Sequence, residues 1–181
     1  VTAVTPLGLM KSGKTLADVS AYLGTQGDGE LLKQLFLGYR SGSLGESSIL
    51  LITLGGLFLL GIGVIQWIIP AAVLGSTFLF SWILGMNPLF SILSGGIAFG
   101  AFFMATDYAT RPLTPKGQII FGIGIGLITS VIRKFGGFPE GVTYAILIMN
   151  IATPFLNKMR VKKYGFVPPV KPAKPSKEAA R

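Results

Sequence analysis

The residue types that this chain lacks limit the chemistry that it can perform. The 181-residue sequence contains no cysteine and no histidine. Its own side chains therefore cannot form disulfides, iron–sulfur sites or histidine-ligated haem and zinc centres. Imidazole acid–base catalysis is excluded for the same reason. The groups that remain are hydroxyls, amides, a few carboxylates and any cofactor that the chain binds.

Three polar residues are candidates for moving or coordinating an ion. Asp107 ends a long uncharged run, with Arg111 four residues later, and ionisable groups at membrane depth are often functional. A capping or loop-anchoring role for Asp107 is the alternative. Glu140 precedes an apolar segment, where a helix dipole favours a carboxylate. Asn150 lies in the middle of that segment and either bonds a cofactor or bridges helices.

One stretch matches a nucleotide-binding motif by its letters. Residues 8–15 read GLMKSGKT, which fits the P-loop pattern. A P-loop requires a strand before it and a helix after it, within a sheet. The preceding Thr2, Thr5 and Pro6 make a poor buried strand, and no apolar run ending in Asp follows. We interpret the match as fortuitous and expect no nucleotide binding there.

The segments that would position these residues are apolar. No Lys, Arg, Asp or Glu occurs from Ser47 to Thr106, which is long enough for three membrane spans of about 20 residues each. Two further apolar segments follow, so the sequence predicts an integral membrane protein in a lipid bilayer. The last two predicted spans are short. They are expected to be supported by polar extensions or thinned lipid, or to be broken helices. The five predicted spans are 48–65, 67–84, 89–105, 118–132 and 142–156.

Glycines recur at helical spacing within these segments. Gly96 and Gly100 form one small-xxx-small pair, and Gly122 and Gly126 form another. Such pairs allow helix backbones to approach closely in lipid, so we expect them at packing interfaces. A glycine-lined pocket for a flat ligand is the functional alternative.

The charge distribution predicts the orientation and the domains. Residues 158–181 carry eight basic and one acidic side chain, out of a net charge of +9 for the chain. A basic tail beside a membrane helix marks the cytoplasmic side, so it indicates no nucleic-acid partner. Five spans then place residues 1–47 outside. The predicted domains are this outward loop, a membrane domain over 48–157, and a disordered cytoplasmic tail.

Two smaller features concern the first of these domains. The sequence ELLKQLFLGY at 30–39 places Leu31, Leu32, Leu35 and Phe36 on one face and predicts an amphipathic helix. The chain begins at a valine within a polar stretch, with no leader visible. We therefore expect that a preceding part of the protein is absent from this sequence.

Four blocks of sequence carry a resemblance to a known family. They are SGSLGES at 41–47, LSGG at 93–96, FFMATD at 102–107 and PEGVTYAILIMN at 139–150. In this order they resemble the RnfD subunit of the Rnf electron-transport complex and its sibling, the NqrB subunit of the sodium-translocating NADH:quinone oxidoreductase. The resemblance is to the C-terminal half of the RnfD subunit. It implies an all-α integral membrane fold of about five transmembrane helices, half of an inverted-repeat bundle similar to urea transporters.

The resemblance also implies a covalent flavin. Members of this family carry FMN on a threonine, through a phosphoester bond, in a run similar to Ser/Thr-Gly-Ala-Thr-Pro-Leu. Here residues 2–7 read TAVTPL, so Thr5 is the expected attachment site and Thr2 the second choice. From residue chemistry alone, Thr5 would only cap a turn before Pro6. Related subunits also hold a riboflavin, and they end the last span with an acid where this chain has Asn157.

The function that the resemblance implies is electron transfer. The chain would be a multi-pass subunit, in the inner (plasma) membrane of a prokaryote, of a complex that couples ferredoxin:NAD electron transfer to sodium or proton translocation. Iron–sulfur and FMN subunits would be its partners, and a flavin transferase would attach the cofactor. Alone it would catalyse no complete reaction. The alternative is a channel or transporter for a small solute, with a fold similar to urea transporters.

Overall fold

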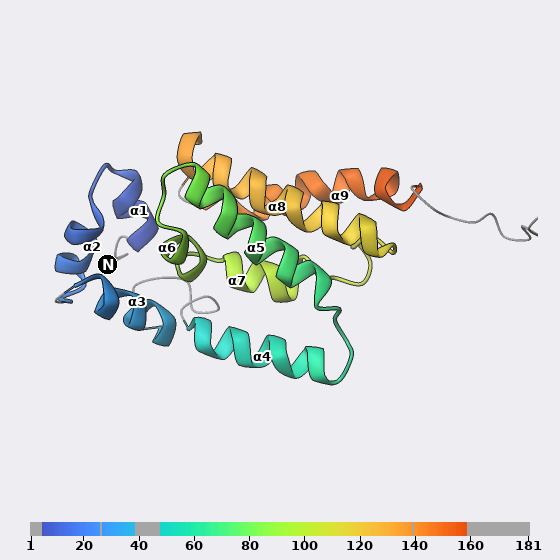
Figure 1. Ribbon diagram of the computed structural model, residues 1–181, viewed down its shortest axis with the longest axis horizontal. Coiled ribbons are helices and arrows are strands. Elements are labelled where there is room, and N and C mark those ends of the chain that lie inside the picture. The colour runs from blue at the N-terminus through green and yellow to red at the C-terminus, as the bar shows by residue number, and fades with distance from the viewer. Residues whose placement is uncertain (1–4, 26, 39–47, 139, 159–181) are drawn as a thin grey trace, which may run out of the picture.

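The computed structural model describes residues 5–25, 27–38, 48–138 and 140–158, and every residue in a regular element there is helical (Figure 1). The all-helical prediction is therefore confirmed for the described chain. The helices, in order, are α1 (Pro6–Lys11), α2 (Leu16–Tyr22), α3 (Asp28–Leu37), α4 (Ile49–Gly61), α5 (Ile68–Ile83), α6 (Pro88–Leu93), α7 (Ile97–Phe99), the π-helix η1 (Gly100–Met104), α8 (Pro115–Phe135) and α9 (Val142–Lys158).

The three longest helices, α5, α8 and α9, form the body of the molecule. Helix α8 packs against both of the others, and α4 lies apart from them on the far side of α7 (Figure 1). The main core cluster lies among these helices and η1. It contains Ile69, Val73, Ile97, Ala101, Phe121, Ile125, Val142, Ala145 and Ile146.

Glycines set the spacing between α5 and α8. A Cβ atom on Gly122 would lie 2.5 Å from the Ala72 Cβ, and one on Gly126 would lie 2.8 Å from the Thr77 backbone nitrogen. Ser76 Oγ, also on α5, donates to the Gly122 carbonyl oxygen at 3.2 Å. Side chains at the two glycines would hold the helices apart. The second glycine pair thus acts in packing, as predicted.

The third predicted span is not one continuous helix. Instead of running from 89 to 105, the chain forms α6, breaks at Ser94, Gly95 and Gly96, and continues as α7 and η1. Gly95 has φ +72°, a left-handed conformation that side-chain-bearing residues rarely adopt. Of the alternatives considered for the short fourth and fifth spans, broken helices are not found. Helices α8 and α9 are continuous and extend beyond the predicted limits, as the alternative of polar extensions requires. The periodicity of an all-apolar segment cannot reveal a backbone break.

Helix lengths bear on the membrane prediction. By length and composition, α8 qualifies as able to cross a bilayer, while α4 and α5 are shorter apolar helices of 13 and 16 residues. The ends of α4 and α5 lie within a few residues of the limits predicted for the first two spans, 48–65 and 67–84. Asn87 caps α6 by accepting from the Phe90 N–H at 3.1 Å, with Pro88 in the first turn, so the predicted interruption at residues 85–88 is confirmed.

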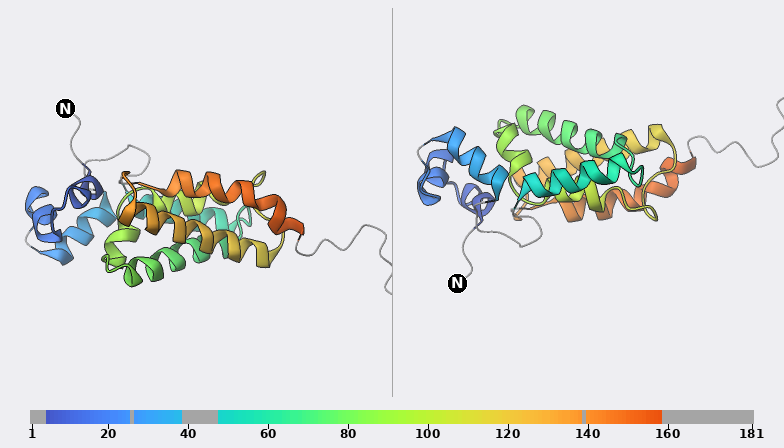
Figure 2. Two further views of the ribbon diagram at one scale, coloured as in Figure 1. Left: turned by 90° about the horizontal axis from the view of Figure 1, so that it is seen from above. Right: turned by 90° about the horizontal axis from the view of Figure 1, so that it is seen from below.

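The first segment contains more structure than the predicted polar loop. Its described residues form α1, α2 and α3, grouped at one end of the molecule, whereas α9 ends at the opposite end (Figure 2). The predicted amphipathic helix is present as α3, with Leu31 and Leu35 fully buried and Phe36 39% exposed. These leucines pack with Leu7, Leu9, Val19 and, from α6, Phe90. A residue of the bundle therefore completes this small core, which explains why the sequence of the segment alone did not indicate one.

Candidate functional site

Thr5, the expected flavin site, lies at the start of α1. Its Oγ1 accepts a hydrogen bond from the Gly8 N–H at 3.2 Å, and Pro6 occupies the first helical position. Thr5 is therefore an N-cap, as its residue chemistry predicts. Thr5 is partly buried. Thr2, the second choice, lies outside the described residues.

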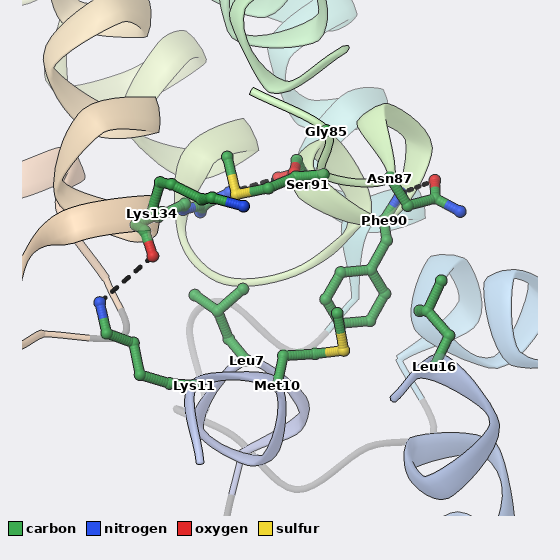
Figure 3. A pocket seen from close by; sticks show the side chains of 11 residues that line it. Leu7, Met10, Lys11, Leu16, Gly85, Asn87, Phe90, Ser91 and Lys134 are labelled. Atoms are coloured by element: carbon green, nitrogen blue, oxygen red, sulfur yellow. Dashed lines mark hydrogen bonds between the residues drawn. The ribbon is translucent and has the colours of Figure 1, made fainter. Parts of the chain in front are cut away.

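A pocket of about 450 Å³ lies beside α1, next to the loop between α5 and α6 and the end of α8. Its walls are mainly apolar, and its charged groups are all cations. Figure 3 shows Lys11 and Lys134 on one side and Leu16 on the other. The lining residues are Leu7, Met10, Lys11, Leu16, Gly85, Met86, Asn87, Phe90, Ser91, Arg133 and Lys134. Thr5 is the N-cap of α1, and three residues of that helix, Leu7, Met10 and Lys11, line the pocket.

Lys11 joins α1 to the end of α8. Its Nζ donates to the carbonyl oxygens of Ile132, Arg133 and Phe138, each at 3.2 Å. The last carbonyls of a helix lack intrahelical partners, and the helix dipole favours a cation beside them. Lys11 thus caps α8 from a helix more than 120 residues away in sequence.

Arg133 caps a second helix in the same manner. The predicted span limits left it in the loop between the last two spans, but it belongs to the last turn of α8 and is only 7% exposed. Its Nη1 donates to the Ser91 carbonyl oxygen, and its Nη2 donates to that of Ser94 at 3.2 Å. Both carbonyls lie at the C-terminal end of α6, where the third apolar segment breaks. The guanidinium therefore lies at the helix break.

Glu140 is brought to the same place. A Cβ atom on Gly95 would lie 2.9 Å from Glu140 Oε1 and 3.0 Å from Arg133 Nη2. The carboxylate and the guanidinium thus both lie beside Gly95, at the break. As expected, Glu140 lies two residues before the start of α9. In the structure its side chain lies near a buried cation, Arg133.

Asp107 lies at the other end of the bundle. It is exposed between η1 and α8, and its Oδ2 accepts from Thr110 Oγ1 at 3.1 Å. Arg111 lies over the Tyr108 ring, 5.3 Å from its centroid. Nearby, Asn157 accepts from the Leu113 N–H at 2.9 Å, so its amide anchors this loop. The structure does not bring Asp107 together with Glu140.

Asn150 lies between the two ends, on α9. Its side chain is partly buried, and its Oδ1 has no hydrogen-bond partner among the described residues. A buried acceptor without a partner is uncommon and indicates a missing donor. This observation leaves both of the roles considered above open, since a cofactor or another subunit could supply that donor.

The P-loop match has no P-loop geometry. Gly8, its first glycine, lies inside α1, and its Thr15 caps α2 in a capping box with Asp18. Hydrogen bonds from the Thr15 backbone and hydroxyl lower the pKa of Asp18. A helix thus occupies the positions where a strand and a phosphate loop would be required. The absence of nucleotide binding stays a prediction.

Sequence reasoning missed Lys11 and Arg133, two cations of the site. One signal was present for Arg133, because basic residues are favoured in the last turn of a helix and glycines follow it. The predicted end of that span at residue 132 was too early by three residues. For Lys11 the sequence holds no signal, since its partners are set by tertiary packing.

Comparison with known proteins places this arrangement in a family. The model of the NQR2, RnfD, RnfE family matches residues 1–165. The chain is 47% identical over 166 residues to the D subunit of the proton-translocating ferredoxin:NAD(+) oxidoreductase complex of Clostridium ljungdahlii, covering 87% of this chain and 49% of that protein. It is 44% identical over 177 residues to the Na(+)-translocating counterpart of Acetobacterium woodii, covering 96% and 52%.

A third relative is more distant. The D subunit of the ion-translocating oxidoreductase complex of Stutzerimonas stutzeri is 40% identical over 174 residues, covering 91% of this chain and 48% of that protein. The chain therefore spans about half the length of the curated relatives that it matches. Since the family model covers almost the whole sequence and all three relatives align over most of it, the chain belongs to the NQR2, RnfD, RnfE family.

Proposed function

We propose that the chain is a membrane electron-transfer subunit that carries covalent FMN on Thr5. It would act in a complex that couples ferredoxin:NAD electron transfer to the movement of sodium ions or protons. The named relatives are subunits of such complexes, and one is named for protons and another for sodium. The observation that supports the flavin is the position of Thr5, a partly buried N-cap at the start of a helix that lines a pocket.

The residues around Thr5 suit an attached flavin phosphate. When bound, FMN would supply one-electron chemistry that a chain without cysteine and histidine cannot supply itself. Thr5 would hold the phosphoester, and the apolar side chains of Leu7 and Met10 would offer a surface for a flat ring. Lys134, exposed at the rim, would favour the negative charge of the phosphate. The residues that line the pocket include no carboxylate that would oppose it.

Membrane insertion is supported by the outward faces of the helices. Large apolar side chains stand exposed along α4, α5, α8 and α9, far beyond the scattered apolar residues of a soluble surface. A lipid bilayer is the environment that suits such faces. Examples are Leu51, Leu54, Leu57 and Phe58 on α4, Trp82 and Ile83 on α5, Ile119, Ile123 and Leu127 on α8, and Leu147, Ile148, Ile151 and Phe155 on α9.

The arrangement of the ends supports the proposed orientation. Helices α1–α3 and the end of α9 lie at opposite ends of the bundle, so a membrane across the bundle would separate them (Figure 2). We propose that Thr5 faces outward and that the chain after Lys158 is cytoplasmic. We further propose that the membrane segments form one half of an inverted-repeat bundle, with α6 and α7 as its broken helix.

Mass spectrometry of the denatured chain tests the flavin directly. The natively matured chain is expected to carry the mass of one FMN less one water, the balance for a phosphoester. Thr5→Ala and Thr5→Asn should both abolish this adduct, and Thr5→Ser should retain part of it. Asparagine is the matched control, because it preserves an N-cap but has no hydroxyl to esterify. Loss with Ala but not with Asn would show that the cap, not the ester, is required.

The same sample distinguishes a flavin subunit from a solute channel, and attachment at Thr5 from attachment at Thr2. A fluorescent band under ultraviolet light on a denaturing gel is expected for a covalent flavin, whereas a solute channel predicts none. An adduct that persists in Thr5→Ala but disappears in Thr2→Ala would move the attachment to Thr2. A natively matured chain without any flavin mass would contradict the proposed function. Maturation requires a flavin transferase, which we propose as a transient partner alongside iron–sulfur and flavin subunits.

A further inference from the structure

The break between α6 and α7 creates a small cluster of buried oxygen atoms. Helix α6 ends at Leu93, so the carbonyl oxygens near its end lack partners within the helix. Ser91 is 4% exposed and Ser94 is fully buried, so water does not reach these carbonyls freely. The Ser94 Oγ is also buried and has no hydrogen-bond partner among the described residues. Buried oxygens of this kind require a donor or a cation.

The groups at the break have the composition of a site for a hard cation. The carbonyl oxygens of Ser91 and Ser94 accept from Arg133, whose Nη2 lies with Glu140 Oε1 beside Gly95, and the unpartnered Ser94 hydroxyl belongs to the neighbouring residue. Small hard cations bind oxygen ligands of these types. The negative end of a helix dipole adds to the attraction, and broken helices in membrane proteins use unwound carbonyls in this way. A side chain at Gly95 would fill the space, because its Cβ would lie 3.0 Å from Arg133 Nη2.

A cation is already present there. The guanidinium of Arg133 donates to both carbonyl oxygens and lies near the carboxylate. We propose that the helix break is a cation site whose resident occupant is the side chain of Arg133, so that a free sodium ion can bind only where the guanidinium is absent. This inference does not depend on the flavin at Thr5. It assigns to Arg133 the role of closing the break, not that of a catalytic residue.

Sodium binding to variants of the chain, assembled in its membrane complex and purified in detergent, tests the proposal. The melting midpoint is measured in sodium chloride and in choline chloride at equal ionic strength. Arg133→Gln should show a sodium-specific rise of about 3–6 °C beyond that of the unmodified protein, when sodium is about tenfold above its dissociation constant. Arg133→Lys is the matched control. It keeps a cation at the break and should respond like the unmodified protein.

Two outcomes would overturn the proposal. One is a sodium response of Arg133→Gln equal to that of the unmodified protein. The other is an equal gain in Arg133→Lys, which would mean that any substitution produces the effect. The Glu140→Gln substitution, added to Arg133→Gln, should reduce the sodium-specific rise, because the carboxylate is one of the proposed ligands.

If the Arg133→Gln chain does not assemble into the membrane complex, a second pair of variants tests the proposal. Removing Arg133 alone leaves the partly buried Glu140 without its neighbouring cation, which is costly for a charge removed from water. In that case the double variant Arg133→Gln/Glu140→Gln is compared with Glu140→Gln alone. The double variant should show the larger sodium response, because only there are the carbonyl oxygens of Ser91 and Ser94 vacated. Equal responses would overturn the proposal.

Discussion

Lys11 Nζ lies 3.2 Å from the carbonyl oxygen of Arg133. This contact connects two helix caps, each of which is made by a cationic side chain. Lys11 of α1 caps the end of α8, and Arg133 at that end caps α6. The position of α1, and with it the position of Thr5, is therefore tied to the helix break through two side chains.

Removing the first cap should release α1 from the bundle. Lys11→Met keeps the aliphatic stem but leaves three carbonyl oxygens without their donor, at a cost of about 1–3 kcal/mol. Faster amide hydrogen exchange is expected in residues 6–11, with α5 and α9 unchanged. Lys14→Met is the control, because Lys14 is exposed. Equal exchange in both variants would contradict the docking role of Lys11.

The glycines between α5 and α8 predict a position-specific loss of stability. Gly126→Ala would place a Cβ 2.8 Å from the Thr77 backbone nitrogen and should destabilise the bundle by about 1–3 kcal/mol. Gly75→Ala, on α5, is the control because nothing lies within 4 Å of its Cβ position. It should be neutral or slightly stabilising, as expected for Gly→Ala in a helix. Melting midpoints in detergent measure both, and a neutral Gly126→Ala would contradict the close packing.

The orientation can be measured with single cysteines, since the chain has none of its own. Lys14→Cys and Lys116→Cys place exposed thiols at opposite ends of the bundle. An impermeant thiol reagent added to intact cells should label position 14 and not position 116. Labelling of both after permeabilisation is the control for reactivity. The reverse pattern in intact cells would invert the proposed topology.

Asp107 should affect ion movement more than stability. Its carboxylate is exposed and accepts from Thr110 Oγ1, so Asp107→Asn should change the free energy of unfolding by no more than about 0.5 kcal/mol. We expect reduced sodium or proton translocation in a complex that assembles normally. Asp18→Asn, at the other end of the molecule, should leave translocation intact. Full translocation in both variants would reduce Asp107 to a solvated loop residue.

The sequence alone determined the class of the protein and much of its local structure. An uncharged stretch of 60 residues, from Ser47 to Thr106, can avoid water only by forming helices whose faces are covered. Helix N-caps are also local interactions. The side chains of Thr5, Asn87 and Thr114 each accept a hydrogen bond from the backbone N–H three residues later in the sequence. The start of α6 at Pro88 agrees with the predicted limit of the third span, whereas the helix starts at Pro6 and Pro115, which also place Pro after a capping residue, were not predicted.

Tertiary structure decided the break in the third apolar segment and the identity of the groups that line it. Residues 89–105 are apolar almost throughout, so their pattern carries no periodicity that distinguishes one helix from two. The partners of the break are distant. Arg133 bonds to carbonyls 39 and 42 residues away, and Lys11 bonds to carbonyls 121 to 127 residues away. Backbone carbonyls are present at every residue, so sequence cannot say which of them a cation will cap until folding has brought the helix ends together.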